Sequence, residues 1–224
     1  MSQIAYLTND DGEFAEWSST VAAGDSTITE IADAAKVGAC GIRCSMALGS
    51  SAYAWTSAYD QALAGGDDLY IGFYFRASSV PANLFNPIAT YNTSDATQAA
   101  MYLWTDGKMS WYVLKDAGGS NHTDDSANVC DGDWHWIVVQ ITRSTGAGNG
   151  GGSLWVDGSE LAVPSLENAT KAASFRNAKI GVPIATLDGW TCDIDEVVIS
   201  LNEYPDPAAG GGTAGGRMML LGVG

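Results

Sequence analysis

In the segment from Leu69 to Ala77 every second side chain is apolar, and this pattern restricts the possible folds more than any other in the chain. Every second residue from Leu69 onward is apolar, whereas the intervening residues include Tyr70 and Arg76. A period of two with one wholly apolar face is typical of a strand that is half buried in a β-sandwich. The face that we expect in the core consists of Leu69, Ile71, Phe73, Phe75 and Ala77.

Two Asp-Gly pairs mark tight turns between neighbouring strands. Asp106-Gly107 separates the runs 101–104 and 109–114, and Asp157-Gly158 follows the run 153–156. Glycine accepts a positive φ angle and aspartate tolerates one, so both pairs favour β-hairpins. About a dozen strands are expected in all, which suits two stacked antiparallel sheets. The further predicted strands lie at 27–31, 41–46, 52–56, 134–142, 178–182 and 192–201, and residues 4–17 are expected to form a short edge strand and a loop.

Three segments together resemble a known family. They are Asp131-Gly132-Asp133-Trp134-His135-Trp136, then 153–158, and finally 194–200, which reads Ile-Asp-Glu-Val-Val-Ile-Ser. This order resembles the skeleton of laminin-G-like, or concanavalin A-like, lectin and glucanase domains. The resemblance implies an all-β, two-sheet antiparallel jelly-roll sandwich over residues 1–204. Residues 205–224 would then form a Gly-rich linker and an apolar tail.

The charge balance disfavours two classes of partner. Twenty-six acidic residues against ten basic ones give a net charge of −16 and a pI near 4.1. Such a surface repels nucleic acid and anionic membranes, and no basic stripe for phosphates is present. No apolar run approaches the length that spans a bilayer. The first residues show no signal peptide, so we expect a mature extracellular protein, another export route, or release within a virus particle.

Asp193 and Asp195 are the candidates for catalytic carboxylates. Glucanases of this fold carry Glu-x-Asp-x-x-Glu or Glu-x-Asp-x-Glu on one strand, with nucleophile and acid ~5–5.5 Å apart. Here the two aspartates share a face, but valine (Val197 or Val198) stands where the last carboxylate belongs. We therefore expect no glycoside hydrolase site.

A polysaccharide lyase is also disfavoured. Lyases on similar sandwiches use Tyr or His together with Arg and Gln on one sheet face. His135 and Gln140 fall on opposite faces of one predicted strand, and an Arg-rich strand is missing. His135 is expected to be a structural residue that forms hydrogen bonds between the sheets. The prediction is a protein without a catalytic site, and the alternative is an extracellular glycan-active enzyme of the same fold.

A structural calcium ion is expected from the resemblance. Related jelly rolls hold such an ion between the N-terminal loop and the aspartate of the closing strand, and Ca²⁺ prefers several carboxylate and carbonyl oxygens. The alternative is that these carboxylates are simply solvated. The candidate ligands are Asp10, Asp11, Glu13, Asp193 and Asp195.

Four cysteines leave the redox state open. Cys40, Cys44, Cys130 and Cys192 show no Cys-x-x-Cys spacing, and with two histidines in the chain a zinc site is not expected. Buried free thiols and one or two disulfides are both compatible with the sequence.

Aromatic residues are the best candidates for a glycan-binding face, because an aromatic ring stacks on the C–H face of a sugar. Any single tryptophan can instead fill the core, and Trp134 and Trp136, which share a face with Val138, are expected there. The candidates on the concave sheet are Trp55, Trp104, Trp111, Trp155, Tyr102 and Tyr112.

The apolar tail suggests an assembly role. A free apolar segment after a Gly-rich linker is unfavourable in water unless it docks, either on its own sandwich or, as we favour, on a neighbouring subunit. The segment consists of Met218, Met219, Leu220, Leu221 and Val223. It is similar to the C-termini of some phage virion proteins. The sequence thus predicts a recognition or structural module that binds glycans or decorates an assembly such as a virion, as an oligomer or docked subunit.

Overall fold

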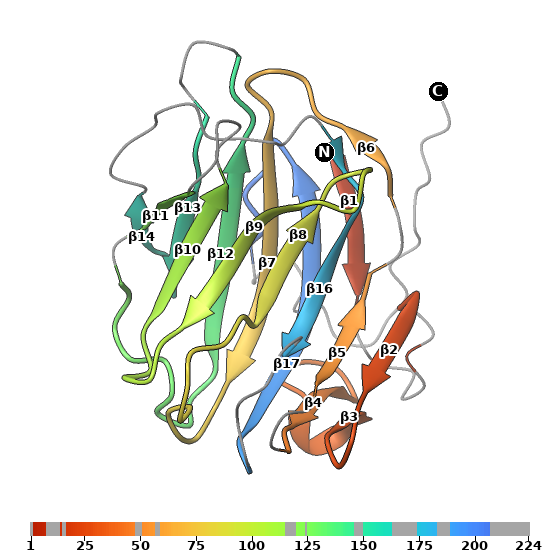
Figure 1. Ribbon diagram of the computed structural model, residues 1–224, viewed down its shortest axis with the longest axis vertical. Coiled ribbons are helices and arrows are strands. Elements are labelled where there is room, and N and C mark those ends of the chain that lie inside the picture. Colours follow the sequence, from red (N-terminus) through yellow and green to blue (C-terminus); the bar gives the residue numbers. More distant parts are fainter. Residues whose placement is uncertain are drawn as a thin grey trace.

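The protein is an all-β sandwich of two large antiparallel sheets (Figure 1). The computed structural model describes residues 2–7, 14, 17–47, 51–56, 59–114, 120–123, 125–145, 150–162, 174–182 and 189–206. The predicted fold class, a two-sheet jelly roll, is confirmed. A single 3₁₀ turn, η1 (Ala32–Ala34), is the one helical element among these residues.

The eight-stranded sheet has the order β14-β13-β12-β7-β17-β4-β3, and β1 pairs with β17 off this path. Its middle is formed by β7 and β17, which are distant in sequence. The strands are β1 (Ser2–Leu7), β3 (Thr27–Ile31), β4 (Gly41–Ser45), β7 (Asp68–Arg76), β12 (His135–Thr142), β13 (Ser153–Val156), β14 (Ser159–Ala162) and β17 (Thr191–Leu201).

The seven-stranded sheet has the order β11-β10-β9-β8-β16-β5-β2. Figure 1 shows β8, β9 and β16 side by side across its centre. The strands are β2 (Ser19–Ala22), β5 (Ala52–Trp55), β8 (Ile88–Tyr91), β9 (Thr97–Leu103), β10 (Met109–Leu114), β11 (Ser120–His122) and β16 (Asn177–Val182). A short third sheet pairs β6 (Gln61–Ala62) with β15 (Ser174–Phe175).

The core lies between the two large sheets, and the alternation along β7 supplies a central part of it. All five residues predicted to face inward are at most 2% exposed. Trp111 of β10 is fully buried in the same core, and its indole N–H donates to the backbone oxygen of Gln140 at 2.8 Å. Because Gln140 belongs to β12, this hydrogen bond ties one sheet to the other.

Both Asp-Gly turns form the predicted hairpins. Asp157 and Gly158 both have positive φ angles, 51° and 80°, which a type I′ turn between β13 and β14 requires. Gly107 has a φ of 80° and its N–H donates to the oxygen of Trp104 at 2.9 Å. The sequence therefore placed the turns of these two hairpins correctly.

Trp136 and Val138 are buried on the face opposite to the one that we predicted. Both point away from the main core, on the outer face of the eight-stranded sheet, where they pair with Tyr74 and Gly72. A Cβ atom on Gly72 would lie 2.6 Å from the Trp136 ring and 2.9 Å from the Pro205 ring. The indole and the proline therefore form a second apolar layer over this sheet. Trp134 is only half-buried.

Within the part of the chain that the structure describes, no helix has the length and apolar character to cross a membrane.

Truncating Phe73 tests the position of the core. Phe73→Ala removes a fully buried ring and should lower the free energy of unfolding by about 2–5 kcal/mol. Ser78→Ala, at an exposed loop position, is the control and should change it by less than about 0.5 kcal/mol. Urea denaturation followed by tryptophan fluorescence measures both. A loss below about 1 kcal/mol for Phe73→Ala would contradict the assigned face.

Candidate ligand-binding face

The six aromatic residues predicted to form one glycan-binding face do not all lie on the same face in the structure. Trp111 is buried in the core, because its side chain on β10 points toward the facing sheet. The prediction that it binds glycans is therefore corrected. Trp155 lies on the eight-stranded sheet, with its ring centroid 6.1 Å from Tyr70 and 5.3 Å from Tyr204. Trp55 lies on β5, and its side chain falls outside the described residues. Three candidates remain together: Tyr102, Trp104 and Tyr112.

These three form a ribbon of rings on the outer face of the seven-stranded sheet. The ring centroids of Tyr102 and Tyr112 are 4.3 Å apart, and Trp104 stacks on Tyr102 at 6.0 Å with 24° between the planes. His122 of β11 stacks on Tyr112 at 4.8 Å. The Trp104 N–H donates to the Ser110 hydroxyl at 2.8 Å, which fixes the indole on this side of the sheet. All three aromatic side chains are half-buried, so part of each ring is open to solvent.

A second group on the same face was not predicted from the sequence. The Lys179 ammonium on β16 lies 4.5 Å from the ring centroid of Tyr53 and 5.3 Å from that of Tyr91. Burial lowers the pKa of Lys179 and raises the pKa of Tyr91, although a hydrogen bond with Thr97 opposes the shift at Tyr91. Both groups therefore favour their uncharged forms more than they would in water.

Small residues separate the two groups. In one cross-strand row, Tyr112 lies opposite Ala100, Ala100 opposite Ala89, and Ala89 opposite Lys179. Three strand spacings of ~4.8 Å place Tyr112 and Lys179 about 14 Å apart across the sheet. The middle of this row thus carries the smallest side chains, and larger side chains stand at its two ends. We call this surface, from Tyr102 and Tyr112 to Tyr91 and Lys179, the trough.

A shallow pocket, wide open to solvent, lies at the β16 end of the trough. Its volume is about 420 Å³, and it is lined by Ser18, Ser19, Tyr91, Asp95 and Asn177. The side-chain oxygen of Asn177 is buried and has no hydrogen-bond partner among the described residues.

Arg176 forms an ion pair with Asp95, which lines this pocket. Its guanidinium pairs with Asp60 at 3.1 Å and with Asp95 at 3.0 Å. Asp95 is thus paired with a cation, whereas the buried Asn177 side-chain oxygen next to the pocket has no hydrogen-bond partner in the described part of the chain.

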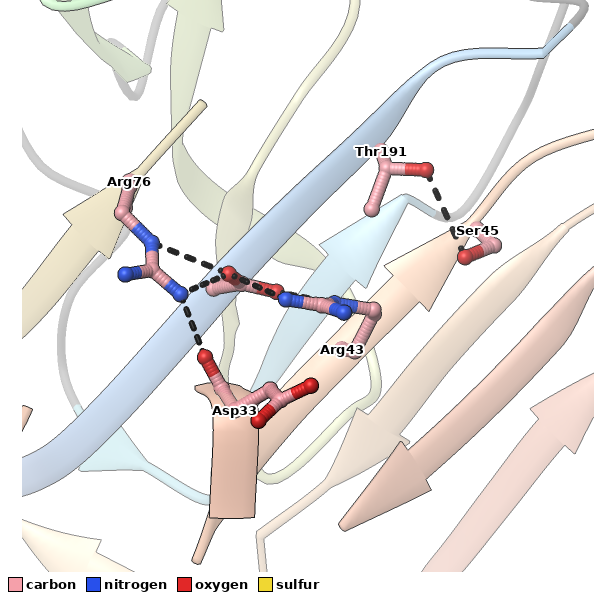
Figure 2. A network of polar contacts seen from close by, with 6 residues as sticks. Asp33, Arg43, Ser45, Arg76 and Thr191 are labelled. Atoms are coloured by element: carbon pink, nitrogen blue, oxygen red, sulfur yellow. Dashed lines mark hydrogen bonds and ion pairs between the residues drawn. The ribbon is translucent and has the colours of Figure 1, made fainter. Parts of the chain in front are cut away.

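Asp193 forms ion pairs with Arg43 and Arg76 on the outer face of the other sheet. Figure 2 shows the two arginine side chains pointing toward each other there. Arg43 donates to it at 2.7 and 3.0 Å, and Arg76 donates at 2.6 and 3.0 Å. Arg76 also donates to the backbone oxygen of Asp33 at 2.6 Å. Two guanidinium groups hold this carboxylate, so it is a structural anion. The prediction of Asp193 as a calcium ligand is therefore corrected.

Asp195 is occupied as well. One carboxylate oxygen accepts the backbone N–H groups of Lys36 and Val37 at 2.7 and 2.9 Å, and the other accepts that of Glu196 at 2.8 Å. These bonds fasten the loop after η1 to β17, and the assignment of Asp195 to an ion is corrected for this reason. Asp10, Asp11 and Glu13 lie outside the described residues. Across the residues that are described, no three His, Cys, Asp or Glu side chains form a metal-binding group.

His135 has a structural environment, although its partners differ from those predicted. Its Nδ1 lies 2.7 Å from Asp157 and its Nε2 lies 3.1 Å from Asp131. Both aspartates lie in the turns at one end of β12 and not on the facing sheet. Asp157 also accepts the backbone N–H of Trp136 at 2.9 Å. The imidazole thus links the two turns that the family-like motif contains.

The sequence matches no protein-family model and no curated protein. The fold does match solved structures. An endo-β-1,4-glucuronan lyase from the fungus Trichoderma reesei has a TM-score of 0.67 and 15% identity, over 89% of this chain and 95% of that one. Binding domains of Paraclostridial Mosquitocidal Protein 1 and of botulinum neurotoxin serotype G give TM-scores of 0.58 and 0.56, with 12% and 14% identity.

The two toxin domains are longer than this chain. The matches cover 89% and 88% of this chain but 48% and 47% of the toxin domains, so this chain spans about half of their length. At these identities the matches show a shared jelly-roll architecture, and function has to be argued from the residues of the site.

The pH dependence of stability tests the role of His135. Burial lowers the pKa of His135, but the hydrogen bonds to Asp157 and Asp131 outweigh it, and the pKa is raised overall. The stabilisation is therefore complete below the unfolded pKa of about 6.5 and is lost as the pH rises through the higher folded value.

We expect His135→Gln to remove this dependence. Urea midpoints measured from about pH 6 to pH 8 should fall with pH more steeply for the unmodified chain than for the variant. His122→Gln, at an exposed histidine, is the matched control and should keep the original slope. Parallel curves for His135→Gln and the unmodified chain would contradict the ion-pair role.

Proposed function

We propose that this protein is a non-catalytic saccharide-binding module and that its ligand lies in the trough of the seven-stranded sheet. The carrying observation is that stacked, half-exposed rings and an unpaired buried acceptor occur at the two ends of one continuous face. A saccharide offers both complements, because its C–H faces stack on aromatic rings and its hydroxyl groups donate hydrogen bonds.

The energetic cost of leaving the Asn177 oxygen without a partner supports a ligand that donates a hydrogen bond to it. A buried oxygen without a partner costs about 1–3 kcal/mol, and a hydroxyl donor in the pocket would recover this. The Lys179 ammonium and the Tyr91 phenol add donors beside it. The aromatic ribbon lies farther along the sheet, so the trough suits a chain of several sugar units better than a single sugar.

Charge favours a neutral saccharide. The net charge of −16 repels polyanions over the whole surface. Within the described part of the trough the carboxylate at the pocket, Asp95, is paired with Arg176, so no pair of free carboxylates stands ready for glycoside hydrolysis.

A lyase is the second candidate, and one observation favours it. Tyr91 and Lys179 contact each other on the candidate face, with pKa values shifted so that the phenol stays protonated and the amine loses its proton more readily. β-Elimination at a uronate needs such a pair, because a base removes the proton beside the carboxylate and an acid protonates the leaving oxygen. The first of the fold matches above is itself a lyase by name.

Immobilised neutral and uronate-containing polysaccharides provide the binding test. We expect the full chain to bind a neutral member, and Tyr102→Ala to weaken that binding about tenfold, the equivalent of ~1.4 kcal/mol. Tyr204→Ala on the opposite sheet is the matched control, because its ring is 38% exposed and far from the trough. No binding at all, or equal losses in the two variants, would contradict the proposal.

Two further measurements use the same protein and polysaccharide samples. Binding is measured with and without calcium, since a structural ion at the N-terminal loop remains a proposal from the sequence. Ultraviolet absorbance of a new double bond conjugated to a carboxylate is followed with the uronate polysaccharides. If this absorbance develops with the unmodified chain and not with Tyr91→Phe, the protein is a lyase and the proposal of a non-catalytic binding module is wrong.

The assembly role is proposed from the sequence of the tail, because 218–223 lie outside the described residues. If the tail docks on another subunit, as in a decorated virion or a similar extracellular assembly, the full chain should be oligomeric in solution. A chain that ends at Pro207 should be a monomer. Light-scattering masses of the two chains test this, and two identical monomers would contradict the assembly role.

A further inference from the structure

Cys44 and Cys192 lie directly opposite each other on neighbouring strands. The antiparallel register of β4 and β17 pairs these two residues. Both side chains are buried, with exposed fractions of 0% and 1%, and the two thiols form a hydrogen bond with each other. All four cysteines of the chain are free thiols in this structure. A pair of thiols in contact at one cross-strand position is thus built into the eight-stranded sheet.

The geometry of this position suits a disulfide. Opposite residues of an antiparallel pair have Cα atoms about 4.5–5.5 Å apart, and disulfides span Cα distances of about 4.4–6.8 Å. The two side chains leave the sheet on the same face, toward the core. The bond can therefore form without a shift of either strand.

The facing sheet holds one of the sulfurs in place. A Cβ atom on Gly181 of β16 would lie 3.0 Å from the sulfur of Cys44. Glycine at this position, with a φ of 106°, leaves the room that the sulfur occupies. Cys44 is thus confined between its cross-strand partner and the opposite layer, which favours contact with Cys192.

We propose that Cys44 and Cys192 are a redox modification site that closes to a cross-strand disulfide when the chain folds in the presence of a small-molecule disulfide such as oxidised glutathione. The thiolate of one cysteine attacks the glutathione disulfide, forms a mixed disulfide and releases one glutathione thiolate. The second cysteine, after loss of its proton, attacks the mixed disulfide and releases the second glutathione. Overall, the two protein thiols give up two protons and two electrons, and one glutathione disulfide becomes two glutathione thiols.

Burial determines when the reaction takes place. The hydrogen bond to Cys44 and burial in the core raise the pKa of Cys192 well above its ordinary value, so the reactive thiolate is scarce in the folded protein. The bond forms while β4 and β17 pair during folding, and oxidant added to the folded chain reacts far more slowly. The finished disulfide links residues that are distant in sequence and restricts the unfolded chain.

Cys130 is the rival partner. It is buried, and this burial raises its pKa to about 12. Cys130 does not occupy a paired strand position, whereas Cys44 is held opposite Cys192 by the ladder. Cys40, the remaining cysteine, precedes β4 and is half-buried. The register therefore selects one of the six possible cysteine pairs.

The test is to refold the full chain in a glutathione redox buffer and to map its disulfides by mass spectrometry after digestion without reduction. We expect one linked peptide pair that joins Cys44 to Cys192, and its mass is lower by two hydrogen atoms than that of the two free peptides. A linked pair through Cys130 or Cys40, or free thiols throughout, would overturn the proposal. This measurement uses the unmodified chain, so it does not depend on a variant that folds.

Variants provide the second readout. Cys130→Ala should keep the linked pair, and Cys192→Ala should remove it without producing a new one. The urea midpoint of the oxidised chain should be higher than that of the same sample after reduction, and this difference should persist in Cys130→Ala. A midpoint that does not respond to reduction in the unmodified chain would argue against a bond between the two strands.

Discussion

The pairing of β7 with β17 in the middle of the eight-stranded sheet is the constraint on which the rest of the structure depends. β17 pairs with β7, β4 and β1, and a bulge between Asp195 and Val198 changes its register part way along. This arrangement buries Asp193, and an unpaired carboxylate there would cost several kcal/mol. Arg43 and Arg76, from the strands on either side, supply the countercharge, so the sheet order and this ion-pair network require each other.

The sequence predicts the faces of a strand well where one face alone is apolar, as in β7. It fails where both faces of a strand are covered. Trp136 and Val138 are buried as expected, yet they lie beneath Pro205 on the outer face, because alternation gives parity but not side. The same ambiguity placed Trp111 among the candidate ligand residues, although it is part of the core. The shared face of Asp193 and Asp195 was correct, but their partners come from distant segments.

The two ends of the trough differ in how well the sequence predicts them. Tyr102 and Tyr112 lie on strands joined by one hairpin, so their contact follows from local alternation and the Asp-Gly turn. Tyr91 and Lys179 meet because β8 pairs with β16, a crossover that no local pattern reveals. The sequence does predict part of this end. Asn177 and Lys179 alternate with the buried residues Ala178 and Ile180, so the two polar side chains must share the outward face.

The outer faces of the two sheets differ in which side chains cover them, and the proposed ligand face is the less covered of the two among the described residues. On the eight-stranded sheet, Pro205 and Tyr204 cover Gly72 and Tyr70, and the loop after η1 is fastened to Asp195. The Trp155 ring packs against Tyr70 and Tyr204 there. On the seven-stranded sheet the row between Tyr112 and Lys179 is floored by alanine. The proposed ligand face thus combines stacked rings, a row of small side chains and a buried amide oxygen without a partner among the described residues.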